Sequence, residues 1–133
     1  MEVIICPDEQ AVGRIAAERI ARVLAQAKTP VLGVATGSTP LTTYSSLAVL
    51  AQEGKADFTG LRAFALDEYV GLPADDERSY AATIRHTVTE QLGLDPAEVH
   101  TPDGMADDLE AACADYEKAI QEADGVDVQI LGI

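Results

Sequence analysis

The sequence predicts an α/β fold with a doubly wound, mostly parallel sheet, and three observations support this prediction. Short apolar runs that suit buried strands alternate with longer stretches of helical periodicity. A cluster of small residues follows one of these runs and leads directly into a helix. Hydrophobic residues make up 47% of the 133 residues and aromatic residues only 5%, as in an α/β protein rich in Ala, Val and Leu. We therefore expect a Rossmann-like three-layer sandwich with right-handed connections.

The first half of the chain predicts two strands, each followed by a helix. Residues 3–6 are apolar and end at Pro7, which indicates a first strand. Asp8 is the expected cap of a helix whose apolar residues recur three and four positions apart: Val12, Ile15, Ala16, Ile20, Val23, Leu24 and Ala27. A second strand at residues 31–35 leads through a turn into a helix at residues 41–51. Thr39 is the expected N-cap of that helix, and Pro40 its first residue.

The second half continues the alternation. A third strand is predicted at residues 62–67, with Phe64 on one face and Ala63 and Ala65 on the other. Helices are predicted at residues 79–92 and 107–123. Residues 126–131 indicate a fourth strand that is apolar on both faces, as a central parallel strand would be. We find no repeat and no interdomain linker.

Charge and composition exclude several classes of function. Nine basic and 23 acidic residues give a net charge of −14, without a basic cluster, so no nucleic-acid partner is expected. No signal peptide or membrane-spanning run is present, and we expect a cytoplasmic protein without a membrane partner. Cys6 and Cys113 have no metal-ligand spacing, which favours buried reduced thiols. No metal and no cofactor are expected.

The stretch VLGVATGSTPLTTY at residues 31–44 predicts an anion-binding turn between a strand and a helix. Free N–H groups at the helix start and the hydroxyls of Thr36, Ser38 and Thr39 would surround one spot, with Gly37 allowing a close approach. The stretch matches neither GxGxxG nor GxxxxGK[ST], so a sugar phosphate fits better than a nucleotide. A turn that merely connects the strand to the helix is the alternative.

Two carboxylates, Asp67 and Glu68, follow the third predicted strand at the same edge of the sheet. Side chains adjacent on an extended strand point to opposite faces, so only one of them can be the base in a single site. Such a base could remove a proton from a carbon next to a carbonyl group. The alternative is an acidic strand end that faces solvent.

The segments LGVATGSTPLTTY and LDEYVGLP, followed by Ser79 and Tyr80, resemble the glucosamine-6-phosphate deaminases in order and separation. The resemblance implies conversion of glucosamine 6-phosphate and water to fructose 6-phosphate and ammonium. It implies that Asp67 moves the proton between C1 and C2. It also implies that the substrate binds at Glu68 and at the turn formed by Thr36, Gly37, Ser38 and Thr39, mainly through its phosphate.

Members of that family continue after a strand like VQILGI into a loop of the form GxxGHIGFNEP, which residues 1–133 do not contain. His86, expected on a helix surface, and His100, expected in a Pro-flanked loop, are not expected to replace it. Residues 1–133 are therefore predicted to form the amino-terminal part of a single domain whose sheet ends after about the fourth strand. Alone they are expected to release no ammonium and to associate through the exposed strand edge into a homo-oligomer.

Three rival functions remain open. The 6-phosphogluconolactonases share the small-residue turn but usually carry DER where this chain has Asp67, Glu68 and Tyr69. Ribose-5-phosphate isomerases share a TGST turn but lack the DEYVGLP segment. A non-catalytic sugar-phosphate sensor would carry an added basic DNA-binding module, whereas the first predicted strand begins at Val3 here.

Overall fold

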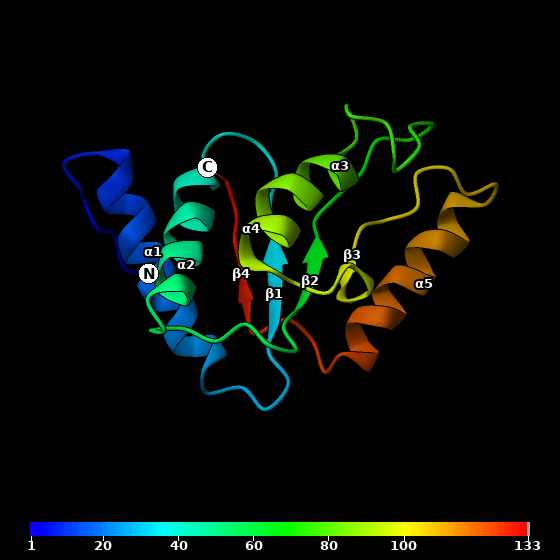
Figure 1. Ribbon diagram of the computed structural model, residues 1–133. Helices are drawn as coiled ribbons and strands as arrows, with labels where there is room; N and C mark the ends of the chain where they lie inside the picture. The colour runs from blue at the N-terminus through cyan, green and yellow to red at the C-terminus, as the bar shows by residue number, and fades with distance from the viewer. Residues whose placement is uncertain (133) are drawn as a thin grey trace.

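The computed structural model describes residues 1–132 and contains a parallel sheet between two helix layers (Figure 1). Its strands are β1 (Val31–Val34), β2 (Arg62–Ala65), β3 (Val99–His100) and β4 (Val128–Gln129). They lie in the order β3-β2-β1-β4, and all three pairings are parallel. The predicted α/β, doubly wound, mostly parallel fold is confirmed.

Most helices cover one face of the sheet. They are α1 (Glu9–Leu24), α2 (Leu41–Gln52) and a continuous run formed by α3 (Tyr80–Ile84), the π-helical segment η1 (Arg85–Thr89) and α4 (Glu90–Leu92). The other face carries α5 (Leu109–Glu122), on the far side of the sheet from α1 and α2 in Figure 1. A 3₁₀ turn, η2 (Pro96–Glu98), precedes β3. The arrangement has the three expected layers.

The larger core lies between the sheet and the first helix layer. Apolar side chains from both sides of this interface form one buried cluster, which includes Ile20, Leu32, Val34, Leu47, Ala63, Ile84 and Val88. Gly13 lets α1 approach α2 closely, since a Cβ atom there would lie 2.6 Å from the carbonyl of Thr42. A smaller cluster of Val31, Phe64 and Ala123 lies under α5. The predicted division of Phe64 and Ala63 between opposite faces is confirmed.

Side-chain caps begin several helices. Asp8 accepts a hydrogen bond from Ala11 N at 2.7 Å, as predicted. Ser79 and Asp108 cap α3 and α5 in the same way. The predicted cap at Thr39 is wrong, because α2 begins at Leu41 with Pro40 in the cap position and no side-chain cap bond.

Two strand predictions need correction. Residues 3–6 form no strand, and Val3 and Ile5 are 73% and 94% exposed, because no described strand pairs with them. The strand predicted at residues 126–131 is limited to Val128–Gln129 at the sheet edge, and Gln129 is exposed rather than part of an apolar face.

One strand was not predicted at all. β3 has only two residues, each paired with β2, and it follows the turn that begins at Pro96. His100 therefore lies in a strand and not in the loop expected from its neighbours, and its ring stacks on Phe64 with 4.7 Å between ring centroids. A run of two residues is too short to show an alternating pattern.

Within residues 1–132, no helix combines the length and the hydrophobicity needed to cross a membrane.

Candidate functional site

The carboxyl ends of β1 and β2 form the edge of the sheet where the predicted site residues gather. Val34, the last residue of β1, is in register with Ala65, the last residue of β2. Thr36 and Asp67 each follow two residues beyond this pair, so parallel pairing brings the turn and the acidic loop to the same edge. The two segments that the sequence singled out are therefore neighbours in space.

The strand order also favours this edge as a binding site. From β1 the chain proceeds to β2 and β3 on one side, and α5 then carries it over the opposite face to β4 on the other side of β1. In open α/β sheets such a reversal creates a crevice at the carboxyl ends of the strands, where ligands bind. The turn after β1 lies at this reversal.

The turn itself is open to solvent. Thr36 is half-buried, whereas Gly37, Ser38 and Thr39 are exposed. Gly37 has φ 96° and no atom within 4 Å of a Cβ position, so it provides a left-handed conformation in free space. Among residues 1–132, the N–H groups of Gly37, Ser38 and Thr39 donate to no protein acceptor. These donors are available to an anion at the start of α2.

A buried tyrosine anchors the turn to the core. The Tyr44 hydroxyl donates to Ala35 O at 2.8 Å and accepts from Ala35 N at 3.0 Å. Burial raises the pKa of Tyr44 to about 12, so the hydroxyl remains protonated and can donate. The residue directly before Thr36 is therefore fixed, while the turn beyond it keeps its donors free.

The acidic loop after β2 places its two carboxylates in different surroundings. Asp67 is exposed at the edge of the sheet. Glu68 is half-buried, and its Oε1 accepts from Tyr69 N at 2.8 Å and from Tyr80 N at 2.9 Å. Its Oε2 accepts from Ala81 N at 2.8 Å. Asp67 is thus the carboxylate open to a ligand, and the substrate-binding role expected for Glu68 stays a prediction.

Two tyrosines lie beside the carboxylates, and sequence reasoning assigned neither of them to the site. The rings of Tyr69 and Tyr80 are 4.6 Å apart, and Tyr80 Oη donates to Tyr69 Oη at 3.1 Å. This hydrogen bond, burial and the nearby Tyr69 phenol raise the pKa of Tyr80, and the Asp67 carboxylate acts in the same direction. The nearby Thr36 side chain acts against them. Tyr80 therefore lies close to both halves of the site.

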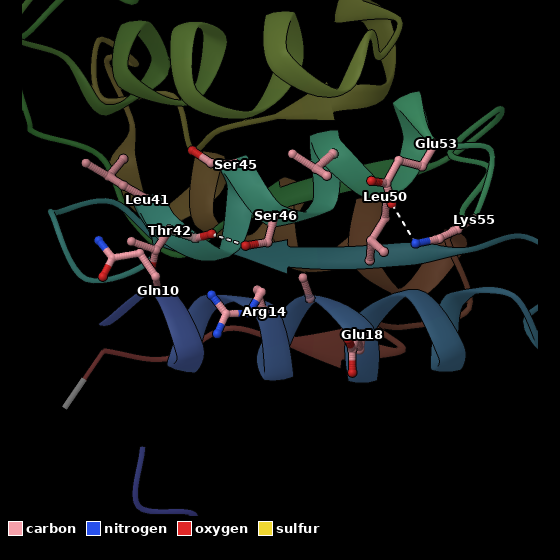
Figure 2. Close-up of a pocket in the computed structure, with 12 residues that line it drawn as sticks. Gln10, Arg14, Glu18, Leu41, Thr42, Ser45, Ser46, Leu50, Glu53 and Lys55 are labelled. Atoms are coloured by element: carbon pink, nitrogen blue, oxygen red, sulfur yellow. Dashed lines mark hydrogen bonds and ion pairs between the residues drawn. The ribbon is translucent and has the colours of Figure 1, made fainter. Parts of the chain in front are cut away.

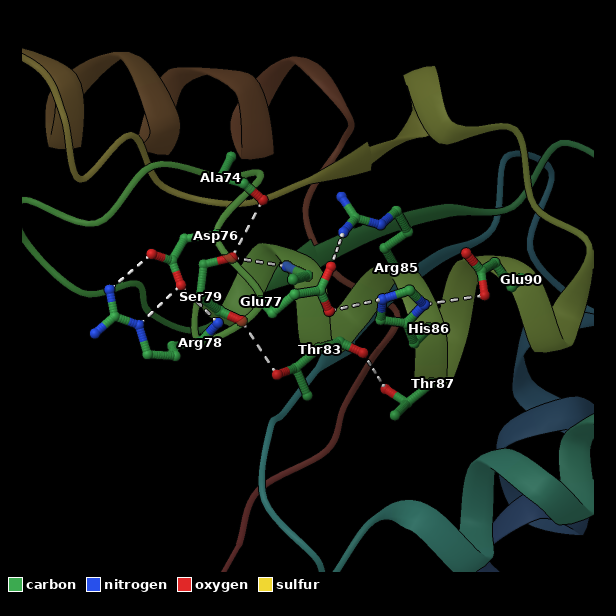
Figure 3. A network of polar contacts seen from close by, with 11 residues as sticks. Ala74, Asp76, Glu77, Arg78, Ser79, Thr83, Arg85, His86, Thr87 and Glu90 are labelled. Carbon is green, nitrogen blue, oxygen red and sulfur yellow. Dashed lines mark hydrogen bonds and ion pairs between the residues drawn. The ribbon is translucent and has the colours of Figure 1, made fainter.

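A charged network surrounds the start of α3 and the π-helical segment (Figure 3). Glu77 contacts Arg85 at 3.6 Å and His86 Nε2 at 3.4 Å, and Glu90 contacts His86 Nδ1 at 3.1 Å. Arg78 pairs with Asp76 at 2.8 Å, and the Arg78 hydrogen bond lowers the pKa of Asp76 to about 2. His86 is exposed, as predicted, and Arg78 and Arg85 are both paired with carboxylates.

A groove lies elsewhere, between α1 and α2 (Figure 2). It has a volume of about 630 Å³ and is lined by Arg14, Glu18, Leu41 and Val49, among others. None of the predicted site residues borders it. One end of the groove, at Leu41 and Thr42, lies at the start of α2, so the groove is a neighbour of the turn at residues 36–39 and not a part of it.

The remaining candidate ligands do not form a metal centre. Within the described part of the chain, no group of three His, Cys, Asp or Glu residues could hold a metal ion. Cys6 and Cys113 are free thiols. The prediction that both are buried is wrong, because Cys113 is exposed on α5 and Cys6 is only half-buried.

The comparisons with known proteins agree on one family. Residues 7–133 match the model of the family described as glucosamine-6-phosphate isomerases/6-phosphogluconolactonase. A glucosamine-6-phosphate deaminase of Cutibacterium acnes is 90% identical over all 133 residues, and that of Corynebacterium glutamicum is 49% identical. The matches cover 100% of this chain and 51% of each relative, so the chain spans about half the length of these curated relatives.

Solved structures support the fold. A monomeric glucosamine-6-phosphate deaminase aligns with a TM-score of 0.94 and 36% identity, covering 100% of this chain and 55% of that one. A 6-phosphogluconolactonase from Thermotoga maritima aligns with a TM-score of 0.70 and 22% identity, over 92% of this chain and 53% of that one. The second similarity shows a shared fold.

Proposed function

This chain belongs to the family of glucosamine-6-phosphate isomerases and 6-phosphogluconolactonases, and we propose that its carboxyl edge serves the deamination of glucosamine 6-phosphate. In this reaction glucosamine 6-phosphate and water give fructose 6-phosphate and ammonium. The observation that carries the proposal is the register of β1 and β2, which brings an anion-binding turn beside an exposed carboxylate. The relatives named as deaminases support the same reaction.

The turn at residues 36–39 binds the phosphate group in this proposal. Its exposed N–H groups and hydroxyls offer several donors at the start of a helix of 12 residues, where the helix dipole favours an anion. The net charge of −14 makes this local arrangement necessary, because the overall field of the chain repels a phosphorylated sugar. Thr36, Gly37, Ser38 and Thr39 are the residues proposed to hold it.

Asp67 is the proposed base. In the open-chain sugar it takes the proton from C2 and returns it to C1, which turns the C2 amine into an imine. Water then adds to C2, the carbon–nitrogen bond breaks, and ammonium leaves a ketone behind. Asp67 suits this step because its carboxylate lies open at the edge, whereas the oxygens of Glu68 already accept hydrogen bonds from backbone N–H groups.

Tyr69 supports the deaminase over the lactonase reaction. The 6-phosphogluconolactonases usually carry DER where this chain has DEY, so an arginine stands there at the position of Tyr69. In this chain the phenol of Tyr69 instead accepts a hydrogen bond from Tyr80 beside Asp67. The 6-phosphogluconolactonase structures that align with the chain are 19–23% identical and bear on the fold alone.

The test compares two forms of the protein. The 133-residue chain is assayed as it is, and a second form is joined to the remaining sequence of the Cutibacterium acnes relative, of which the chain covers 51%. We expect the longer form to release ammonium and fructose 6-phosphate in equal amounts, and the 133-residue chain to release neither. Hydrolysis of 6-phosphogluconolactone without ammonium release by the longer form would overturn the proposal.

A further inference from the structure

We infer that Glu68 and Gly104 are positioning residues that fix the acidic loop from two sides and so hold Asp67 in place. The inference rests on the proposed function, because it concerns the base of that reaction. It assigns Glu68 a task within the protein rather than at the substrate. It also assigns a role to the loop after β3, which neither the sequence motifs nor the proposed reaction include.

Glu68 forms a clamp between the end of β2 and the start of α3. Three backbone N–H groups, those of Tyr69, Tyr80 and Ala81, donate to its two oxygens at 2.8–2.9 Å. A carboxylate offers about four acceptor positions, so most of its capacity is used. Hydrogen bonds from N–H groups to a charged acceptor are among the stronger ones in proteins.

The clamp closes a loop of the chain. Tyr80 and Ala81 are 12 and 13 residues beyond Glu68 in sequence, and they begin α3, which includes the buried residues Ala82 and Ile84. Because that helix is packed in the core, Glu68 is tied to a rigid element. Asp67, the preceding residue, is attached to β2 on one side and to this clamp on the other.

Gly104 braces the same loop from the opposite segment. Its carbonyl oxygen accepts a hydrogen bond from Gly71 N at 2.8 Å. A Cβ atom on Gly104 would overlap the carbonyl oxygen of Tyr69 and lie 3.0 Å from its carbonyl carbon. The absence of a side chain at residue 104 therefore permits two backbone segments to touch. Any larger residue would push the acidic loop away.

The two contacts act on adjacent residues of the loop. Glu68 fixes its beginning, while Gly104 contacts Tyr69 and Gly71. Tyr69 in turn accepts the hydrogen bond of Tyr80, which lies near Thr36 on the other half of the site. Displacing the loop would thus change the separation between the base and the phosphate-binding turn. A displacement of about 1 Å can lower a rate about 100-fold.

The experiment uses the longer form described above, with Glu68→Ala, Glu68→Gln and Gly104→Ala. Glu77→Gln is the matched control, because Glu77 is an exposed carboxylate of the same connection whose partners are the exposed side chains of Arg85 and His86. We expect Glu68→Ala and Gly104→Ala to lower kcat about 10- to 100-fold, with KM for glucosamine 6-phosphate changed less than about threefold. Glu77→Gln should change neither.

Glu68→Gln separates positioning from simple loss of a side chain. Glutamine keeps one oxygen for Tyr69 N and Tyr80 N but turns an NH₂ group toward Ala81 N, so its kcat should lie between those of the parent and of Glu68→Ala. A rise in KM with an unchanged kcat would make Glu68 a substrate-binding residue and overturn the inference. Unchanged kcat and KM in Glu68→Ala would also overturn it.

A second measurement tests the clamp without turnover. Amide hydrogen exchange in the 133-residue chain should become faster at Tyr80 and Ala81 in Glu68→Ala and remain unchanged in Glu77→Gln. Unchanged exchange in Glu68→Ala overturns the clamp itself. Absence of ammonium release by the parent enzyme instead overturns the proposed function, and with it the catalytic consequence inferred here, so the two failures are distinguishable.

Discussion

The turn after β1 and the loop after β2 meet at the same edge of the sheet but are built in opposite ways. The turn leaves its backbone donors free, and Gly37 lies in open space. The loop after β2 is instead held by hydrogen bonds within the protein. Backbone N–H groups of α3 donate to Glu68, and Gly71 N donates to the carbonyl oxygen of Gly104. The difference matches the demands of the two proposed tasks, because binding an anion needs unpaired donors, whereas moving a proton needs a fixed base.

Both segments nevertheless start from a strand end held by a tyrosine. The Tyr44 hydroxyl is fully buried and exchanges two hydrogen bonds with Ala35 at the end of β1. The Tyr116 hydroxyl, from the opposite helix layer, contacts Ala65 O at 2.8 Å and His100 O at 3.1 Å. Burial raises the pKa of Tyr116 as well, so it too stays a donor. Because a tyrosine hydroxyl anchors both strand ends, the difference between the two segments arises from the residues that follow the strands.

Removal of the base should have the largest effect. In the longer form, Asp67→Asn keeps the size of the side chain but removes its basic charge, and we expect kcat to fall by about two to four orders of magnitude. The assay is ammonium release from glucosamine 6-phosphate at saturating substrate. Asp75→Asn, an exposed carboxylate farther along the same connection, is the control and should retain activity. Turnover of Asp67→Asn near that of the parent would remove Asp67 from the mechanism.

A substitution in the turn should affect binding instead. Gly37→Val places a branched side chain at φ 96° and blocks approach to the backbone donors, so we expect KM to rise about tenfold or more, as for a lost hydrogen bond to a charged group. Gly54→Val is a matched control, because Gly54 also has a positive φ, 67°, with open space around it, but follows α2. Gly54→Val should introduce the same backbone strain as Gly37→Val but leave KM unchanged. Equal affinity for fructose 6-phosphate in folded Gly37→Val and in the parent would contradict the assignment.

The turn at residues 36–39 and Asp67 also show how much of the site can be predicted from the sequence. Thr36 to Thr39 and Asp67 could be placed together because apolar runs identify β1 and β2, and parallel strands end at a common edge. The contacts of Glu68 and Gly104 could not be predicted, because they join segments 12 to 35 residues apart through backbone groups that any sequence possesses. For Tyr69 and Tyr80, the only sequence signal was their presence in the DEY and SY segments that carry the family resemblance.

The fold shows the same limit. The start of α1 and both ends of α5 were predicted within two residues, because their caps and periodic apolar residues are local signals. The apolar periodicity carried the prediction for α1 to Ala27, whereas the helix ends at Leu24. Residues 3–6 carry the composition of a strand, yet a strand forms only where another strand supplies hydrogen-bond partners. β3 is the reverse case, since its two residues become a strand through pairing with Ala63 and Phe64.

The two tyrosine anchors should differ in their contribution to stability. Tyr44→Phe leaves the N–H and carbonyl groups of Ala35 without their buried partner, and we expect the free energy of unfolding to fall by about 1–3 kcal/mol. Tyr116→Phe removes a half-buried donor, and the expected loss is about 0.5–1.5 kcal/mol. Urea unfolding of the 133-residue chain measures both. A larger loss for Tyr116→Phe would show that the turn after β1 does not depend on its anchor as described.

The smallest effect should come from the charged network at the far end of the β2 connection. Hydrogen bonding to Glu90, followed by the charges of Glu90 and Glu77, raises the pKa of His86. The stabilisation is therefore complete below the unfolded pKa of about 6.5 and disappears as the pH rises through the higher folded value. Because these side chains are exposed, we expect the melting temperature of the parent to exceed that of His86→Gln by on the order of 1 °C at pH 5.5.

The pH dependence and the salt dependence of this difference test its cause. At pH 8.5, or at pH 5.5 in 1 M salt, the two melting temperatures should coincide, because the imidazole is then neutral or its charge is screened. A difference that grows with pH would contradict the sign derived from the raised pKa. Catalysis by the longer form should be the same in both variants, since the network holds only the outer end of the connection, whereas Glu68 and Gly104 contact the residues next to Asp67.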